Sequence, residues 1–182
     1  TCNCRGRSAA GIFLYIREAQ ERDIPYLMEI YNYEVEHTTA TFDVHPRTLE
    51  DRTEWFRQHN VGNHPLFVAE EDGRAVGYAS FSTYRSLEAY HDTVELSVYV
   101  DHGYRRRGIA DSLLRHILAW GRAREDVHMV ISVISGENET SVHLHEKFGF
   151  AYAGTIREAG KKFGRYLDIV NYQLVFHNGS AD

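Results

Sequence analysis

The chain contains few of the residues that mark several large classes of protein. Its 2 cysteines, Cys2 and Cys4, are too few for a disulfide framework or a zinc site. With only 3 prolines and 14 glycines among 182 residues, a collagen-like repeat is excluded and a disordered chain is disfavoured. Every apolar run is shorter than the roughly 20 residues that span a bilayer. Residues 1–11 also lack the apolar stretch of a secretory signal. We therefore expect a cytoplasmic protein with no metal site and no membrane partner.

Positive charge is also scarce. Lys and Arg number 20 against 26 Asp and Glu, and the formal net charge of −6 disfavours a nucleic-acid partner. Hydrophobic residues make up 43% of the chain and aromatic residues 13%, which is enough for the core of one domain. The sequence thus predicts a loose extension over residues 1–11, one domain over 12–177 and a short tail over 178–182.

The chain does contain a regular succession of apolar patterns. Period-2 alternation predicts strands, and apolar residues three and four apart predict amphipathic helices. The predicted strands are 12–17, 66–70, 75–82, 93–100, 129–134, 152–158 and 167–176, and the predicted helices are 24–36, 49–58, 110–124 and 139–148. This order predicts an α/β fold with a mixed central sheet of about six to seven strands flanked by helices. The strand–helix–strand unit over 93–134 should be parallel and right-handed.

The most informative segment begins with the strand predicted over 93–100. Its residues alternate between two faces: Val94, Leu96, Val98 and Val100 on one, and Thr93, Glu95, Ser97 and Tyr99 on the other. Three consecutive arginines, 105–107, and Gly108 then precede a predicted helix. The free amides at a helix N-terminus attract an anion, and Gly108 lets the backbone approach closely. The G-x-G-x-x-G fingerprint and the P-loop motif are both absent. From these residues alone, the segment is either an anion site or an ordinary surface loop.

The strand before this loop and the helix after Asn138 add to the signal of the loop. The runs T-V-E-L-S-V-Y-V, R-R-R-G-I-A and N-E-T-S-V-H-L-H-E-K-F-G-F occur in that order. In this combination the chain resembles the Gcn5-related N-acetyltransferase superfamily, and within it the phosphinothricin and methionine sulfoximine acetyltransferases. The superfamily signature Q/R-x-x-G-x-G/A falls on Arg105, Gly108 and Ala110. The resemblance covers about residues 13–176, including the runs 32–42 and 160–168, and implies a single domain of this superfamily's type.

The resemblance implies acetyl-coenzyme A (acetyl-CoA) as the donor of the acetyl group. The pyrophosphate of the donor would lie on the amides of residues 106–111, and its pantetheine arm would pair with the backbone of residues 98–100. Asn138 would contact the far end of that arm. The expected cofactor-binding residues are Val98, Tyr99, Val100, Arg105, Arg106, Arg107, Gly108, Ile109, Ala110, Asp111 and Asn138.

Glu95 and His145 are the candidate catalytic residues. By pattern alone, Glu95 is a solvent-facing side chain and His145 a buried structural histidine. An amine is largely protonated in neutral water, however, so a carboxylate must accept its proton before it can attack a thioester. The resemblance gives that role to Glu95. It gives His145, in a position where many members have tyrosine, the role of protonating the leaving thiolate.

The loop over 84–91 resembles the substrate loop of the same enzymes. Arg85 could bind a substrate carboxylate through two hydrogen bonds. The alternative is a mobile polar loop with no role. The expected substrate-binding residues are Arg85, Glu88, Ala89, Tyr90, Phe42 and Lys162.

The resulting hypothesis is an N-acetyltransferase that acts on a small, glutamate-like amino acid by direct attack, without an acyl-enzyme. A protein N-terminus, a polyamine or an aminoglycoside is the alternative acceptor. A non-catalytic acyl-CoA-binding sensor domain is an alternative of another class. The resemblance also suggests a homodimer.

Overall fold

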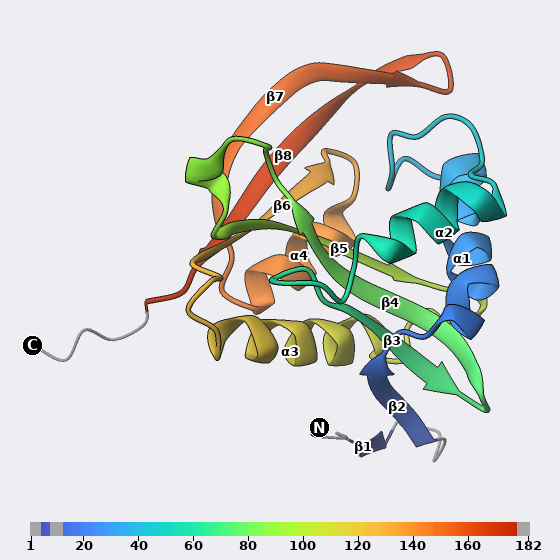
Figure 1. The fold of residues 1–182 in the computed structure, drawn as a ribbon. Coiled ribbons are helices and arrows are strands. Elements are labelled where there is room, and N and C mark those ends of the chain that lie inside the picture. Colours follow the sequence, from blue (N-terminus) through green and yellow to red (C-terminus); the bar gives the residue numbers. More distant parts are fainter. Residues whose placement is uncertain (1–4, 8–12, 178–182) are drawn as a thin grey trace, which may run out of the picture.

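The protein is an α/β domain built on one mixed sheet, as the sequence predicts (Figure 1). The computed structural model describes residues 5–7 and 13–177. The strands are β1 (Arg5–Arg7), β2 (Phe13–Glu18), β3 (Leu66–Glu71), β4 (Arg74–Thr83), β5 (Thr93–Val100), β6 (Met129–Ser135), β7 (Ala151–Lys162) and β8 (Arg165–Val175). The α-helices are α1 (Ile24–His37), α2 (Leu49–Arg57), α3 (Ile109–Arg122) and α4 (Glu139–Lys147), and three short 3-10 helices occupy Glu21–Asp23, Glu88–Tyr90 and His102–Tyr104.

The strand order is β1-β2-β3-β4-β5-β6-β8-β7, and neighbouring strands are antiparallel except for β5 and β6. The parallel β5–β6 pair confirms the pairing expected for the unit over 93–134. The linker from 38 to 48 ends in a capping box, in which the Asp51 amide donates to Thr48 Oγ1 at 3.1 Å. Among the helices described, none is long and apolar enough to cross a membrane.

The structure differs from the expectation at its N-terminal end. Residues 1–11 were expected to lie outside the fold, but Arg5–Arg7 form β1 and pair antiparallel with the start of β2. This pairing is made by backbone groups, so the sequence R-G-R carries no apolar alternation that would announce it. The remainder of that extension, with Cys2 and Cys4, and the predicted tail over 178–182 lie outside the described residues.

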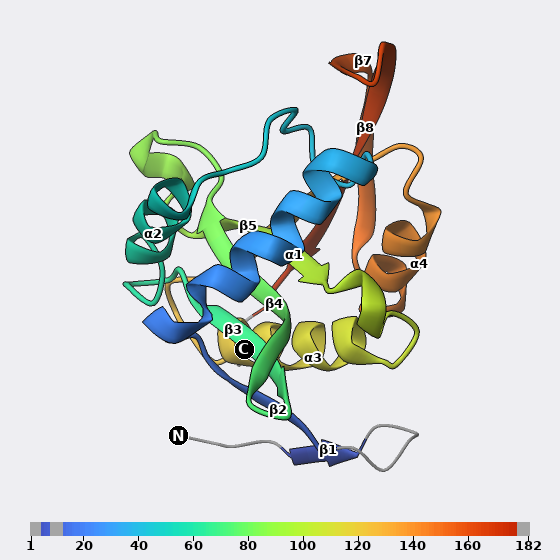
Figure 2. The ribbon, with the colours of Figure 1, turned by 90° about the vertical axis from the view of Figure 1, so that its right-hand side faces the viewer.

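The helices cover opposite faces of the sheet and create two cores (Figure 2). The larger core joins α3 and α4 to one face, with Phe81, Leu113 and Ile117 fully buried. The smaller core joins α1 and α2 to the other face around Leu27 and Tyr78. The hairpin β7–β8 projects beyond the rest of the sheet (Figures 1 and 2).

The sheet opens at its centre, and this opening positions the site. β5 pairs with β4 along 94–100, but it pairs with β6 only over 93–95. Beyond Glu95 the two parallel strands separate, and β6 continues its pairing with β8 as far as Ser135. The edge of β5 that faces β6 is therefore free over residues 96–100.

Candidate active site

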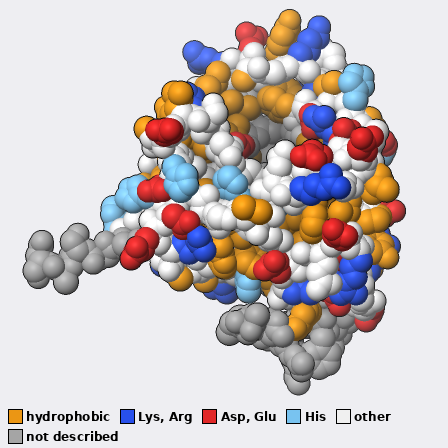
Figure 3. Space-filling view, viewed as in Figure 1, with side chains coloured by type: hydrophobic (Ala, Val, Ile, Leu, Met, Phe, Trp, Pro, Cys, Tyr) orange, Lys and Arg blue, Asp and Glu red, His pale blue; other side chains and the backbone are white. Residues whose placement is uncertain are grey.

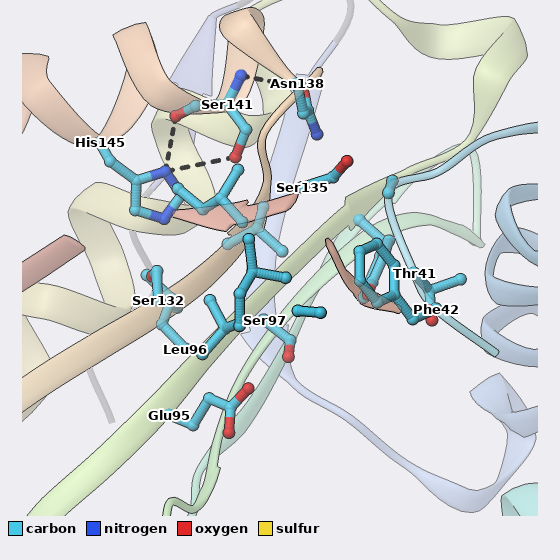
Figure 4. Close-up of a pocket in the computed structure, with 17 residues that line it drawn as sticks. Thr41, Phe42, Glu95, Leu96, Ser97, Ser132, Ser135, Asn138, Ser141 and His145 are labelled. Atoms are coloured by element: carbon cyan, nitrogen blue, oxygen red, sulfur yellow. Dashed lines mark hydrogen bonds between the residues drawn. The ribbon is translucent and has the colours of Figure 1, made fainter. Parts of the chain in front are cut away.

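A cavity of about 340 Å³ lies where β5 and β6 separate. Figure 3 shows the hollow below the projecting hairpin, with apolar side chains on its rim and charged side chains of both signs on one side. Glu95 of β5 lines the cavity together with Asn138 and His145, which belong to the cap and the body of α4 (Figure 4). Three serines, Ser97, Ser132 and Ser135, line it as well, so its wall is partly polar.

Glu95 occupies the point at which the strands diverge. It is the last residue of β5 that pairs with β6, opposite Ile131, and it is half-buried. Among the described residues its carboxylate has no hydrogen-bond or ion-pair partner, and burial raises its pKa above the ordinary value for glutamate. A carboxylate with a raised pKa and no partner is a competent proton acceptor.

His145 lies on the inner face of α4 and is only 5% exposed. Its Nδ1 is 2.6 Å from the Ser141 carbonyl oxygen, so Nδ1 carries the hydrogen and donates it. The lone pair of the ring is then on Nε2, and burial lowers the pKa of the imidazole. Burial therefore favours the neutral imidazole, with Nδ1 fixed on α4 and no partner for Nε2 among the described residues.

Asn138 connects the cavity to the free edge of β5. Its Oδ1 accepts from the Ser141 amide at 3.1 Å and so caps α4, while its side-chain nitrogen has no partner within the described chain. A second opening of about 330 Å³, lined by residues 98–100, Arg105 and Asn138, continues from the cavity. The predicted pantetheine residues and Asn138 thus line one continuous groove.

The arginine-glycine loop lies beyond this groove. Gly108 has a φ of 75° and Arg106 a φ of 62°, so the chain turns sharply before α3 begins. The described residues provide no acceptor for the backbone N–H groups of residues 106–111. A row of free amides at a helix N-terminus is an anion-binding arrangement.

The charged side chains of this loop are partly engaged. Arg105 pairs with Glu34 of α1, and Arg107 Nη1 lies 3.3 Å from Glu71 Oε1. Asp111 pairs with Lys147 and, at 3.1 Å, with Arg115. Both engaged arginines of the loop remain more than 40% exposed, at 48% for Arg105 and 41% for Arg107.

The predicted substrate residues do not all meet at the cavity. Phe42 lines it, and its ring rests on the bare backbone of Gly160, where an added Cβ would lie 2.5 Å from the ring. Lys162 is 3% exposed, and its Nζ donates to the Thr41 carbonyl at 2.8 Å and to that of Glu34 at 3.4 Å. Lys162 therefore holds the backbone next to Phe42 and does not line the cavity.

No residue of the loop over 84–91 lines the cavity at Glu95 or the second cavity beside it, which is described next. Arg85 packs near the rings of Tyr84 and Tyr90, at 5.1 and 5.7 Å from their centres. Glu88, Ala89 and Tyr90 form a 3-10 helix with no buried residue. The substrate-binding roles of this loop stay predictions.

A second cavity of about 490 Å³ adjoins the first on the side of α1 and α2. The two share Thr41, Glu95, Ser97 and Tyr99, so Glu95 faces both. The second cavity is lined further by aromatic and charged side chains and one amide: Tyr31, Asp43, Arg47, Asp51, Arg52, Glu54, Trp55, Tyr78 and Gln58.

Sequence reasoning missed two charged residues around this site, Glu34 and Arg52. Each is 5% exposed. Both stand at helical spacing from core residues, Glu34 four after Ile30 and Arg52 three before Trp55. That spacing is the signal that could have placed them on inner helix faces.

The comparisons with known proteins agree with this geometry. Residues 27–150 match the Acetyltransferase (GNAT) family. A phosphinothricin N-acetyltransferase of Streptomyces coelicolor is 42% identical over 161 residues, covering 87% of this chain and 94% of its own. An L-methionine sulfoximine/L-methionine sulfone acetyltransferase of Pseudomonas paraeruginosa is 36% identical over 160 residues, covering 87% and 92%. A solved GNAT superfamily phosphinothricin acetyltransferase from Sinorhizobium meliloti, in complex with AcCoA, superposes with a TM-score of 0.87 at 30% identity, covering 93% of this chain and 91% of that one.

Proposed function

The chain belongs to the acetyltransferase (GNAT) family, and on that premise we propose that it acetylates the amino group of a small, glutamate-like amino acid. The donor is acetyl-CoA, and the acceptor is of the phosphinothricin or methionine sulfoximine type named for its relatives. One observation carries the catalytic part of the proposal. Glu95 is a half-buried carboxylate with a raised pKa and no partner among the described residues, at the point where β5 and β6 separate.

In the proposed reaction, Glu95 accepts a proton from the ammonium group of the acceptor, directly or through one water. The neutral amine then attacks the thioester carbon. As the tetrahedral intermediate collapses, the carbon–sulfur bond breaks, coenzyme A leaves as the thiolate, and the proton that the new amide nitrogen loses is taken up by sulfur. Free backbone N–H groups along residues 96–100 of β5 are available to stabilise the oxyanion. Alignment of amine and thioester within one cavity supplies much of the acceleration.

The donor occupies the groove that runs from the cavity to the arginine-glycine loop. The pyrophosphate lies on the free amides of residues 106–111, and the exposed guanidinium groups of Arg105, Arg106 and Arg107 add positive charge. The pantetheine amides pair with the free edge of β5 over residues 98–100, and the free side-chain nitrogen of Asn138 donates to the arm.

His145 is placed at the thiolate end of this reaction. Its Nδ1 hydrogen is held by the Ser141 carbonyl, and burial lowers its pKa and so disfavours a second proton on the ring. It can pass on a proton received at Nε2. We therefore expect a smaller loss of activity from His145→Gln than from Glu95→Gln.

The proposal includes a cytoplasmic homodimer. The projecting hairpin β7–β8 carries large apolar side chains that are at least 54% exposed: Tyr152, Ile156, Phe163 and Tyr166. Exposed apolar groups of this kind are typical of subunit interfaces. Light scattering should give twice the 21.0 kDa mass of the chain, and a monomer at micromolar concentration would contradict this part.

The decisive experiment measures release of the coenzyme A thiol with a panel of acceptors. Glutamate-like amino acids should be acetylated with the highest kcat/KM, ahead of a peptide with a free N-terminus, a polyamine and an aminoglycoside. Preference for one of the other acceptors would overturn the amino-acid substrate. Binding of acetyl-CoA without turnover on any acceptor would favour the sensor domain.

The donor site is tested separately, with the substitution Gly108→Asp. Gly108 has a φ of 75°, which an aspartate adopts only with strain, and the substitution adds a negative charge beside the pyrophosphate. Calorimetry should show loss of acetyl-CoA binding in a folded protein. Unchanged affinity would mean that the pyrophosphate binds elsewhere.

A further inference from the structure

Arg52 is a buried cation in the second cavity that faces Glu95. It belongs to the inner face of α2, and its guanidinium lies among three aromatic rings. The guanidinium carbon is 3.8 Å from the centre of the Trp55 ring, 4.6 Å from that of Tyr31 and 5.9 Å from that of Tyr78. Such rings hold a guanidinium in a fixed orientation without neutralising its charge.

The hydrogen-bonding capacity of Arg52 is largely unused. Its one hydrogen bond within the described chain runs from Nη2 to Tyr78 Oη at 3.2 Å. Its Nε is buried and has no partner among the residues that the structure describes. A buried polar group without a partner is costly and uncommon, so its retention needs a cause.

None of the acidic side chains that share the cavity forms an ion pair with Arg52 within the described chain, although the charge of Arg52 adds to that of Arg47 in lowering the pKa of Asp43 against the effect of burial. Asp43 binds Arg47 through two hydrogen bonds, at 2.6 and 3.1 Å, and also the Tyr31 hydroxyl. Asp51 accepts from the Thr48 amide at 2.9 Å in the capping box of α2. Glu54 is on the surface, 3.4 Å from Arg57, and in the described chain no carboxylate oxygen lies within 4.0 Å of an Arg52 nitrogen. A buried charge without a counter-ion is strongly unfavourable, and a ligand with an acid group would supply the missing charge.

Glu95 and Arg52 face the same cavity from two of its walls. Tyr78, which binds Arg52, pairs with Tyr99 in β5, whereas Glu95 is four residues earlier in the same strand. That interval corresponds to roughly 13 Å of strand at the backbone, and both side chains line the same cavity. The walls thus suit a short molecule with an amine at one end and an acid group at the other.

We propose that Arg52 binds an acid group of the acceptor amino acid and so determines which amines are acetylated. This inference rests on the proposed function and adds to it the residue that selects the substrate. The planar guanidinium offers paired N–H donors in the geometry that a carboxylate or phosphinate binds with two hydrogen bonds. The acid group is either the α-carboxylate or the acid at the end of the side chain, and both present the same chemistry to Arg52.

The experiment compares wild type, Arg52→Met, Arg52→Lys and Arg57→Met on three matched acceptors. Arg57 lies on the same helix, is 69% exposed and is the control for loss of one positive charge. The acceptors are a glutamate-like amino acid, its α-amide and its side-chain amide. In wild type, one of the two amides lacks the acid group that Arg52 binds, and its KM should be roughly 10- to 100-fold higher than that of the parent amino acid. The amide with the higher KM shows whether Arg52 binds the α-carboxylate or the side-chain acid. Arg57→Met should retain this discrimination. Arg52→Met should lose it, because all three acceptors then bind weakly, and Arg52→Lys should restore part of it. The KM for acetyl-CoA should stay within about twofold throughout.

Two outcomes would overturn the role of Arg52: equal KM values for acid and amides in wild type, or undiminished discrimination in a folded Arg52→Met. A binding measurement keeps this test separate from the proposed function. The chain has 2 tryptophans, so in a Trp120→Phe background the fluorescence of Trp55, which contacts Arg52, reports on the cavity alone. If no amino acid is acetylated, the proposed function fails, whereas saturable titration of Trp55 by the acid and not by the amide would still support Arg52. The absence of saturable titration by the acid would remove Arg52 as the anchor.

Discussion

Two glutamates near the centre of the molecule, Glu34 in α1 and Glu95 in β5, have opposite surroundings. Glu34 is 5% exposed and fully engaged: Arg105 pairs with it, and the Thr38 hydroxyl donates to its Oε2 at 2.6 Å. Glu95 is half-buried, has no partner in the described chain, and has a pKa raised by burial. One carboxylate is held in place by its contacts, and the other is left free where the strands separate.

The difference distinguishes a structural charge from a reactive one. The ion pair between Glu34 and Arg105 links α1 to the arginine-glycine loop. Both residues line the groove proposed for the donor, so this pair helps to hold the groove in shape. Leaving Glu95 unpaired costs stability, because burial without a partner disfavours the ionised form. A cost of this kind is typical of a group kept available for proton transfer.

The largest effect should come from Glu95→Gln. Removing the proton acceptor leaves the amine protonated, so kcat should fall by roughly 10²- to 10⁴-fold, whereas the Kd of acetyl-CoA stays unchanged. Steady-state kinetics and calorimetry on the same preparation test both halves. Full activity in this variant would remove Glu95 from the mechanism and erase the contrast with Glu34.

The matching change, Glu34→Gln, should have the opposite profile. It removes the charge that pairs with Arg105, and because Arg105 is 48% exposed the loss of unfolding free energy should be about 1–2 kcal/mol. The kcat should change by less than about threefold, since Glu34 takes no proton from the substrate. Urea unfolding together with kinetics measures the pair of effects. A collapse of kcat with unchanged stability would show that Glu34 is itself reactive.

The sequence predicts the centre of the molecule better than its ends. Apolar alternation and helical spacing locate the elements between 66 and 148, since each of them buries one face against the sheet. β1 and the outer part of β7 are mostly polar or exposed and are held by backbone pairing, so their residues carry no apolar pattern. For this reason the predicted strand stops at residue 158, whereas β7 extends to Lys162.

For the site, alternation within one strand places Glu95 on the face opposite Val94, and family motifs point to the donor groove. Neither source shows which charges are paired. Glu34 and Arg52 look alike as charged residues on amphipathic helices, yet one has Arg105 as its partner and the other has no carboxylate within 4.0 Å in the described chain. Pairing of this kind is decided by tertiary packing, which brings together residues 71 positions apart.

The smallest effect should be a pH dependence of the free energy of unfolding, caused by the same raised pKa of Glu95 that makes it a proton acceptor. A raised pKa means that folding favours the protonated carboxyl, so the folded protein holds this proton to higher pH than the unfolded chain. Wild type should therefore lose some stability as pH rises from the ordinary glutamate value through the raised one. Glu95→Gln has no such proton, so its advantage over wild type should be absent at low pH and constant above the raised pKa.

The activity of wild type depends on the same ionisation in the opposite sense: stability is higher with the protonated carboxyl, whereas activity requires the ionised carboxylate. The kcat/KM should fall on the acid side of its pH profile at the raised pKa, because only the ionised carboxylate accepts a proton. Chemical unfolding of both proteins across pH should show the stability gap levelling off at the pH where the acid limb of the wild-type pH–rate profile has its midpoint, since one group governs both. An acid limb at the ordinary glutamate value, or a stability gap that does not vary with pH, would show that the group controlling activity is not the one that burial perturbs.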